Sequence, residues 1–276
     1  MSHSLHDLVV VCNLDHTLLT VRGEIPSVNR DMIQLFCGHG GRFTVATRRS
    51  VASVQAALAG VPLSAPVICC GGSILYDMTK QQCVRRLEMN RETAEKAIRL
   101  VMKNLPDLGV CVHTGLGEWR VIRANRYLEA QRKSERIGCS LSQLSDAPDG
   151  WVQVSFAGSG QQLDQAETLL REKAGYGVYA QRSGSGTLDL LPETASNAAG
   201  LSALSETIGV PLTQMIVIGS HASDLPAMAL AGRAVAVAGA PARVRLAAHV
   251  VTSIGSGDGA VAEYLYHLLR KYEKET

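Results

Sequence analysis

The sequence predicts an α/β protein that carries a second, α+β domain inserted into its parallel-sheet core. Short apolar runs bounded by turn residues alternate with longer amphipathic stretches, as strands alternate with helices around a parallel sheet. From about Cys83 to Leu190 the strand-like pieces instead alternate polar and apolar residues, which is typical of a mixed or antiparallel sheet covered on one side. The expected division is a core formed by residues 1–83 and 191–276, with 84–190 as the inserted domain.

The core elements follow from the apolar runs and from the residues that end them. The expected strands are 8–12, 42–46, 66–70, 215–218, 234–237 and 249–252. A helix over 50–60 is expected to end at Gly60, and a helix that begins near Asn197 is expected to end at Gly209, because glycine caps helix C-termini. The last helix, 259–272, is amphipathic and basic near its end, as the helix dipole favours.

The inserted segment contains two clear helix patterns among short strand-like pieces. The helices are expected over 91–105 and 161–174, and the strand-like pieces are 109–114, 118–123, 151–156 and 177–181. The junctions with the core are expected near 80–83 and 190–195. The "SGSG" at 183–186 predicts a loop close to the return into the core.

The composition indicates a folded, soluble protein of the cytoplasm. With 276 residues, 46% of them hydrophobic, the chain has ample material for a packed core. A net charge of +2 and an aromatic content of 4% disfavour nucleic acid as a partner. The seven cysteines show no zinc or redox spacing and fit buried thiols in a reducing cytosol. The N-terminus lacks the pattern of a signal peptide, and no apolar stretch approaches membrane-spanning length, so we expect no membrane partner.

The chemistry of a parallel sheet is expected just beyond the carboxyl ends of its strands. Four such stretches are "CNLDHT" (12–17), "ATRRS" (46–50), "TASNAAG" (194–200) and "IGSHASD" (218–224). In this order, with an insertion between the second and the third, they resemble the haloacid dehalogenase superfamily of phosphatases, closest to its Cof-type branch. Supporting matches are "GGSILYD" (71–77) and "SGDGAVAEYL" (256–265). The resemblance implies a Rossmann-like parallel-sheet core and an α+β cap domain of type IIB.

The four stretches depart from the family pattern at the positions that carry its chemistry. Family members have a nucleophilic Asp, an acid/base Asp two residues later, a Thr-Gly-Arg stretch, a Lys, and a Gly-Asp-x-x-Asn-Asp stretch that holds magnesium. Here Asn13 stands at the nucleophile position, Asp15 at the acid/base position and Asn197 at the Lys position. Thr47 is followed by Arg48, where the family has Gly, and by Arg49. In the last stretch Gly219 and Asp224 are retained, and Ser220 and Ser223 replace Asp and Asn.

These departures predict loss of the family's covalent reaction. An amide cannot form the acyl-phosphate that a carboxylate nucleophile forms. Magnesium prefers anionic oxygens, which Ser220 no longer supplies, and Asn197 donates hydrogen bonds but no charge. We therefore expect no metal and no cofactor. The expected activity is binding of a small phosphorylated metabolite, either as a pseudoenzyme or regulator or with metal-free acid/base chemistry through Asp15.

Two other functions stay open at this stage. The first alternative is an active sugar- or nucleotide-phosphate phosphatase of this superfamily with an atypical site, which would require magnesium. The third possibility is a scaffold protein with an empty pocket. The oligomeric state is not predicted.

The expected ligand site is a cradle of backbone amides after the first strand, the Thr47 hydroxyl, and Arg48 or Arg49. Asp15, Asp224 and Arg48 sum to a formal charge of minus one, as the family's four carboxylates, Lys and magnesium do. The ligand-binding candidates are Asn13, Leu14, His16, Thr47, Arg48, Arg49, Asn197, Ser220, His221 and Asp224.

Simpler interpretations compete at several of these positions. Asp15 is also placed to cap its own turn, and Thr47 to cap a helix beginning at Arg49 or Ser50. No motif spacing supports a transition-metal site at His16 and His221. Three arginines of the inserted domain are expected on a solvated strand face: Arg120, Arg123 and Arg126.

Overall fold

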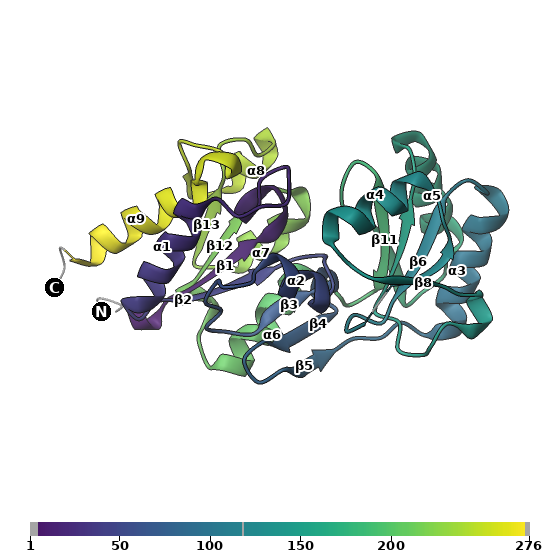
Figure 1. Ribbon diagram of the computed structural model, residues 1–276, viewed down its shortest axis with the longest axis horizontal. Helices are drawn as coiled ribbons and strands as arrows, with labels where there is room; N and C mark the ends of the chain where they lie inside the picture. The colour runs from purple at the N-terminus through teal and green to yellow at the C-terminus, as the bar shows by residue number, and fades with distance from the viewer. Residues whose placement is uncertain (1–4, 118, 274–276) are drawn as a thin grey trace.

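The computed structural model describes residues 5–117 and 119–273 and contains two lobes, each built on its own sheet (Figure 1). The core sheet has eight strands in the order β14-β13-β12-β1-β2-β3-β4-β5, parallel from β14 to β3 and antiparallel at β4 and β5. This confirms the predicted α/β class. The core strands are β1 (Val9–Asn13), β2 (Arg42–Ala46), β3 (Val67–Cys69), β4 (Ile74–Asp77), β5 (Gln82–Arg86), β12 (Met215–Gly219), β13 (Arg233–Ala236) and β14 (Val250–Val251).

Strand β1 is the centre of the core because its side chains are apolar on both faces. Val9 to Cys12 are at most 1% exposed, as expected for a parallel strand covered by helices on both sides. Its neighbours are β2, where Asn13 pairs with Ala46, and β12, where Cys12 pairs with Ile218. The loops that follow these three strands therefore open at the same edge of the sheet.

Six helices pack on the core sheet: α1 (Ser27–Gly38), α2 (Val51–Ala57), α6 (Asn197–Ile208), α7 (Leu225–Leu230), α8 (Ala242–Ala247) and α9 (Ala260–Glu273). Helices α1 and α9 pack against each other, and buried Asn29 accepts the Ala262 N–H at 2.9 Å. No helix within the described residues is long and apolar enough to cross a membrane.

The two predicted glycine caps have different outcomes. Gly209 ends α6 with a φ of 66°, the left-handed conformation that glycine adopts without strain, which confirms the prediction. Gly60 does not cap α2, so that prediction is wrong. The helix ends at Ala57, and Gly60, with a φ of 78°, lies in the following turn, in which the Val61 N–H bonds to the Leu58 carbonyl.

The second lobe, the cap, has a six-stranded sheet in the order β10-β11-β9-β6-β7-β8, antiparallel except between β7 and β8. Its strands are β6 (Gly109–His113), β7 (Trp119–Arg123), β8 (Cys139–Leu141), β9 (Gln153–Ala157), β10 (Val178–Arg182) and β11 (Thr187–Pro192), and its helices are α3 (Arg91–Asn104), α4 (Arg126–Glu135) and α5 (Gly160–Lys173). Helices α3 and α5 cover one face of this sheet with an apolar cluster. Helix α4 packs over the other face, toward the core (Figure 1).

The predicted domain boundaries fall inside strands. The boundary at 83 lies within β5, which pairs with β4 at the edge of the core sheet, and the boundary at 190 lies within β11 of the cap sheet. No residue of β5 is fully buried, so its sequence lacks the continuous apolar run expected of a core strand. Glu118, the first residue of one predicted strand, lies outside the described residues.

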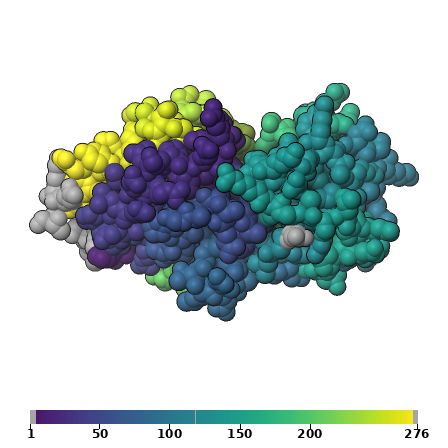
Figure 2. Space-filling model, in the orientation of Figure 1, coloured from purple at the N-terminus to yellow at the C-terminus, as the bar shows by residue number. Residues whose placement is uncertain are grey.

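Core and cap touch directly next to α2, and Figure 2 shows the two lobes in contact there. The Val51 N–H donates to the Gly115 carbonyl of the cap at 3.0 Å, and the Ser53 hydroxyl donates to the Glu135 carbonyl at 3.2 Å. The cap is therefore in hydrogen-bonded contact with the segment that follows β2.

The close approach of the Gly72 backbone to the Ser196 backbone leads to a first prediction. Gly72 has a φ of 94°, and a Cβ there would lie 1.9 Å from the Ser196 carbonyl oxygen. We expect Gly72→Ala to lower the free energy of unfolding by about 2–4 kcal/mol through backbone strain and the clash. Chemical denaturation measures this loss. Gly38→Ala is the matched control, since nothing lies within 4 Å of its added Cβ, and an equal loss in both variants contradicts the prediction.

Candidate ligand site between core and cap

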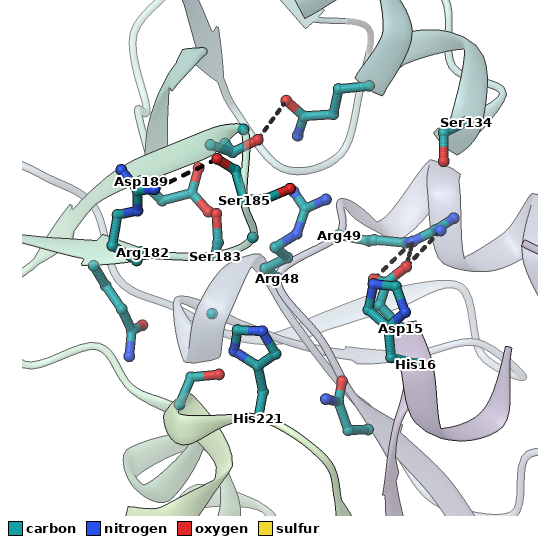
Figure 3. Close-up of a pocket in the computed structure, with 18 of the residues that line it drawn as sticks. Asp15, His16, Arg48, Arg49, Ser134, Arg182, Ser183, Ser185, Asp189 and His221 are labelled. Atoms are coloured by element: carbon teal, nitrogen blue, oxygen red, sulfur yellow. Dashed lines mark hydrogen bonds and ion pairs between the residues drawn. The ribbon is translucent and has the colours of Figure 1, made fainter. Parts of the chain in front are cut away.

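A cavity of about 370 Å³ lies between the two lobes, where the carboxyl ends of β1, β2 and β12 face the cap (Figure 3). Its floor comes from core loops that contain Asn13, Asp15, Arg48 and Asp224. Its roof comes from α4 and from the β10–β11 hairpin of the cap. The cavity thus lies where the sequence predicts a ligand site, at the carboxyl edge of a parallel sheet.

The Asp224 carboxylate is the centre of the cavity floor, and N–H groups surround it. It is 3% exposed. Its Oδ2 accepts the Asn13 Nδ2–H at 2.9 Å and the backbone N–H groups of Ser220 and His221 at 3.0 and 2.9 Å. Its Oδ1 accepts the Asn197 Nδ2–H at 3.4 Å. Burial raises the pKa of Asp224, and the hydrogen bonds from His221, Ser220 and Asn13 offset part of that rise.

These residues do not fit magnesium, which requires several oxygen ligands in octahedral geometry. Both oxygens of Asp224 are occupied by N–H donors, and Asn13 presents its NH₂ group to them. The Ser220 hydroxyl points elsewhere, since it accepts a hydrogen bond from Thr17 at 2.8 Å. Across residues 5–117 and 119–273, no three His, Cys, Asp or Glu side chains lie close enough together to hold a metal ion.

Asp15 is held by Arg49 in a multiple hydrogen-bonded ion pair. Arg49 Nε lies 3.1 Å from each carboxylate oxygen, and its Nη2 lies 2.7 Å from Oδ1. Burial raises the pKa of Asp15, but the hydrogen bonds from Arg49 and the positive charges of Arg48, Arg49 and His16 outweigh it, so the pKa is lowered overall. Asp15 is therefore an ionised acceptor, poorly suited to donate a proton at neutral pH.

Arg48 extends from the core into the cavity (Figure 3). It also pairs with a carboxylate of the cap. Its Nη1 lies 3.2 Å from Oε1 of Glu135, which is 2% exposed. Burial lowers the pKa of Arg48, but the carboxylates of Glu135, Asp15 and Asp189 raise it overall. The charge of Arg48 is thus balanced by a cap residue that the predicted charge sum did not include.

The other predicted residues divide between the cavity wall and the layer behind it. Eight of the predicted residues line the cavity: Asn13, Asp15, His16, Arg48, Arg49, Asn197, His221 and Asp224. Leu14, Thr47 and Ser220 are 0%, 1% and 5% exposed and lie behind it. The Thr47 hydroxyl accepts the Arg49 N–H at 3.2 Å, whereas Ser50 caps α2. His16 has a φ of 56°, a left-handed conformation that suits glycine.

Several residues of the cavity wall were missed by sequence reasoning. They are Asp189, Arg182 and the 183–186 loop, which the sequence marked only as a loop. Asp189 could have been identified from the sequence, because it is the single acidic residue within the buried strand "TLDLLP". Of the three arginines expected on a strand face, Arg120 and Arg123 lie on β7 and are partly exposed, and they donate to Ser140 and to the Pro106 carbonyl. Arg126 instead begins α4 and stacks on Tyr127.

Comparison with known proteins agrees with this geometry. Residues 10–265 match the family model for haloacid dehalogenase-like hydrolases. The chain belongs to that family. This match confirms the predicted resemblance to the haloacid dehalogenase superfamily.

Individual relatives are distant in sequence. A haloacid dehalogenase-like hydrolase from Bacteroides thetaiotaomicron is 21% identical, with a TM-score of 0.86 over 95% of this chain and 99% of that one. A structure described as a subclass IIB sugar phosphatase is 15% identical, with a TM-score of 0.81 over 95% and 98% of the two chains. A Haemophilus influenzae protein named as a candidate phosphatase is 27% identical over 106 residues, which span 38% of this chain and only 40% of that protein. The two structures show a shared fold.

The Asp15 to Arg49 pair makes a prediction about pH. Because the folded-state pKa of Asp15 is lowered, its stabilising contribution is present above the unfolded pKa of about 3.9 and is lost as pH falls through the folded value. We expect Asp15→Asn to reduce the free energy of unfolding at pH 7 by about 2–4 kcal/mol, since it leaves buried Arg49 without its anion. The difference from wild type should shrink below about pH 4.

Urea denaturation at pH 3 to 8 measures that difference. Asp146→Asn, at an exposed carboxylate of the cap, is the matched control and should follow the wild type at every pH. A pH-independent loss in Asp15→Asn would show that the ion pair does not supply the stability.

Proposed function

We propose that this protein binds a small phosphorylated metabolite in the cavity between core and cap and does not carry out magnesium-dependent aspartyl-phosphate hydrolysis. The observation that carries the proposal is the Asn13 amide, which donates to Asp224 at the place where the family reaction needs a carboxylate nucleophile. The Asn197 amide donates to the same carboxylate, where the family has Lys. The proposed role is that of a regulator or sensor.

Metal-free acid/base catalysis through Asp15 is the weaker form of the proposal. A general acid must hold a proton near the working pH, and Arg49 keeps Asp15 ionised. A weakly basic carboxylate that is clamped at both oxygens is also a poor proton acceptor. The site therefore favours binding over turnover.

The ligand class follows from the size and the charges of the cavity. A volume of about 370 Å³ suits a small metabolite. Arg48 and Arg49 face the cavity together with His16 and His221, and the backbone amides after β1 lie on the same floor. A solved relative described as a sugar phosphatase supports a phosphorylated sugar as one ligand of this class. The free cysteines, Cys12, Cys69 and Cys70 among them, support a cytoplasmic location.

The first test of this proposal is turnover. We expect the wild-type protein to show only background hydrolysis of p-nitrophenyl phosphate and of a panel of sugar and nucleotide phosphates with 5 to 10 mM magnesium as a chosen assay condition, since Asn13 forms no acyl-phosphate. The restored variant Asn13→Asp/Asn197→Lys/Ser220→Asp should gain about tenfold or more in kcat/KM. Robust metal-dependent turnover by the wild type, equal to or above that of the restored variant, would falsify the proposal in favour of an active phosphatase.

The second test is ligand linkage. In EDTA, inorganic phosphate at 100 times its Kd should raise the free energy of unfolding by about 2.7 kcal/mol. Thermal unfolding against phosphate concentration measures this, with chloride at equal ionic strength as the control. The double variant Arg48→Gln/Glu135→Gln removes the cavity cation together with its partner, so it should lose part of the phosphate effect without leaving an unpaired charge. If phosphate stabilises the protein only when magnesium is present, the active-phosphatase alternative is supported. If phosphate does not stabilise the protein either in EDTA or with magnesium, the scaffold alternative is supported.

A further inference from the structure

A chain of buried polar side chains crosses the core-facing side of the cap sheet and ends in the cavity wall. His113 Nε2 on β6 lies 2.9 Å from the Ser155 hydroxyl on β9, and that hydroxyl lies 2.6 Å from Oδ1 of Asp189 on β11. The three residues are 4%, 0% and 2% exposed. Asp189 also lines the ligand cavity.

The direction of these hydrogen bonds is fixed by their chemistry. An ionised carboxylate only accepts, so the Ser155 O–H donates to Asp189. Its oxygen is then free to accept from His113, which requires the tautomer with hydrogen on Nε2. Burial lowers the pKa of His113 to about 4, so its ring is neutral and supplies that single N–H. The chain therefore holds Asp189 in place without neutralising its charge.

The register of the cap strands aims Asp189 at the cavity. Along β11, Leu188 and Leu190 point into the apolar cluster under α3 and α5, whereas Thr187, Asp189 and Leu191 line the cavity, as the twofold strand period requires. Ser155 is the directly paired residue on β9, so its hydroxyl lies beside the carboxylate. Figure 3 shows Asp189 beside Ser183 and Ser185, with Arg48 reaching toward them from the core.

Only one carboxylate oxygen of Asp189, a residue of the cavity lining, has a hydrogen-bond donor among the described residues. Ser155 serves Oδ1, but no hydrogen bond reaches Oδ2 from the described part of the chain. In the same wall the Ser183 hydroxyl is buried and has no described hydrogen-bond partner. Buried polar atoms without partners are costly, which suggests that this wall is completed by a ligand.

We propose that Asp189 is a specificity-determining residue, whose Oδ2 accepts a hydrogen bond from a hydroxyl group of the bound phosphate ester. Ser155 and His113 are its positioning residues. The inference rests on the proposed function only in that the ester occupies this cavity. A hydroxyl group suits the site better than an ammonium group, because Arg48 already supplies positive charge and the other neighbours, Ser183 and Thr187, carry hydroxyls.

The test compares two ligands of equal chain length by calorimetric titration. The ligands are sorbitol 6-phosphate, which carries hydroxyls, and n-hexyl phosphate, which does not, with inorganic phosphate as the common reference. The wild type should bind the hydroxylated ester about tenfold or more tightly than the alkyl ester. Asp189→Asn replaces the cavity-facing carboxylate with an amide of the same shape, so it removes the charged acceptor and this ratio should fall severalfold. Because this change removes a negative charge from the cavity wall near Arg48, it should not weaken the binding of inorganic phosphate.

Variants separate recognition from folding. Asp146→Asn is the matched control on the cap surface and should keep the wild-type ratio. Ser155→Ala should lower the ratio, and Ser155→Thr, which keeps the hydroxyl, should restore it. If Asp189→Asn fails to fold, as judged by its thermal transition, Asp189→Ala, which removes the acceptor altogether, replaces it.

The outcomes distinguish this inference from the proposed function. An unchanged ratio in Asp189→Asn, or an equal loss of affinity for all three ligands, overturns the specificity role. A wild-type ratio near one with tight binding of both esters also overturns it and leaves the proposed function standing. Failure of the wild type to bind any of the three ligands overturns the proposed function itself.

Discussion

One buried carboxylate, Asp224, holds together the loops that form the floor of the cavity. Three core loops reach it: the end of β1 through Asn13, the loop after β12 through Ser220 and His221, and the start of α6 through Asn197. A carboxylate removed from water is stable only if its oxygens are satisfied. Here every described donor to Asp224 is a neutral N–H group.

This constraint explains why the departures from the family pattern occur together. A carboxylate at position 13 would face Asp224 across a hydrogen-bond distance and would require a cation between them, whereas an amide donates to it directly. With Asn13 and Asn197 donating to Asp224, the floor contains fewer carboxylates for a metal and a lysine to balance than the family pattern has. The substitutions thus form one self-consistent set, in which hydrogen bonds replace ion pairs.

The sequence predicted which residues lie at the cavity better than it predicted how the charged residues there are paired. The buried run of β1 and the carboxyl-edge rule placed Asn13, Asp15 and Asp224 in one cavity, since both depend on local pattern and on parallel topology. The partners of the arginines were not predictable in the same way. Glu135 reaches Arg48 from a cap helix, and only the tertiary packing of cap on core brings the two together. The prediction that Gly60 caps α2 was wrong because Gly60 adopts its positive φ in the tight turn that follows the helix. Hydrophobic periodicity does not predict such a turn.

The segment after β2 links the ligand cavity to the position of the cap. Arg48 lines the cavity and pairs with Glu135, while Val51 and Ser53, on the next turn of the chain, donate to cap carbonyls. An anion that draws Arg48 away from Glu135 leaves a buried carboxylate without its partner, which disfavours the closed contact unless the ligand also bonds to the cap. A ligand that reaches Asp189 provides such a bond. A ligand that bonds to both Arg48 and Asp189 would therefore contact the core and the cap at once.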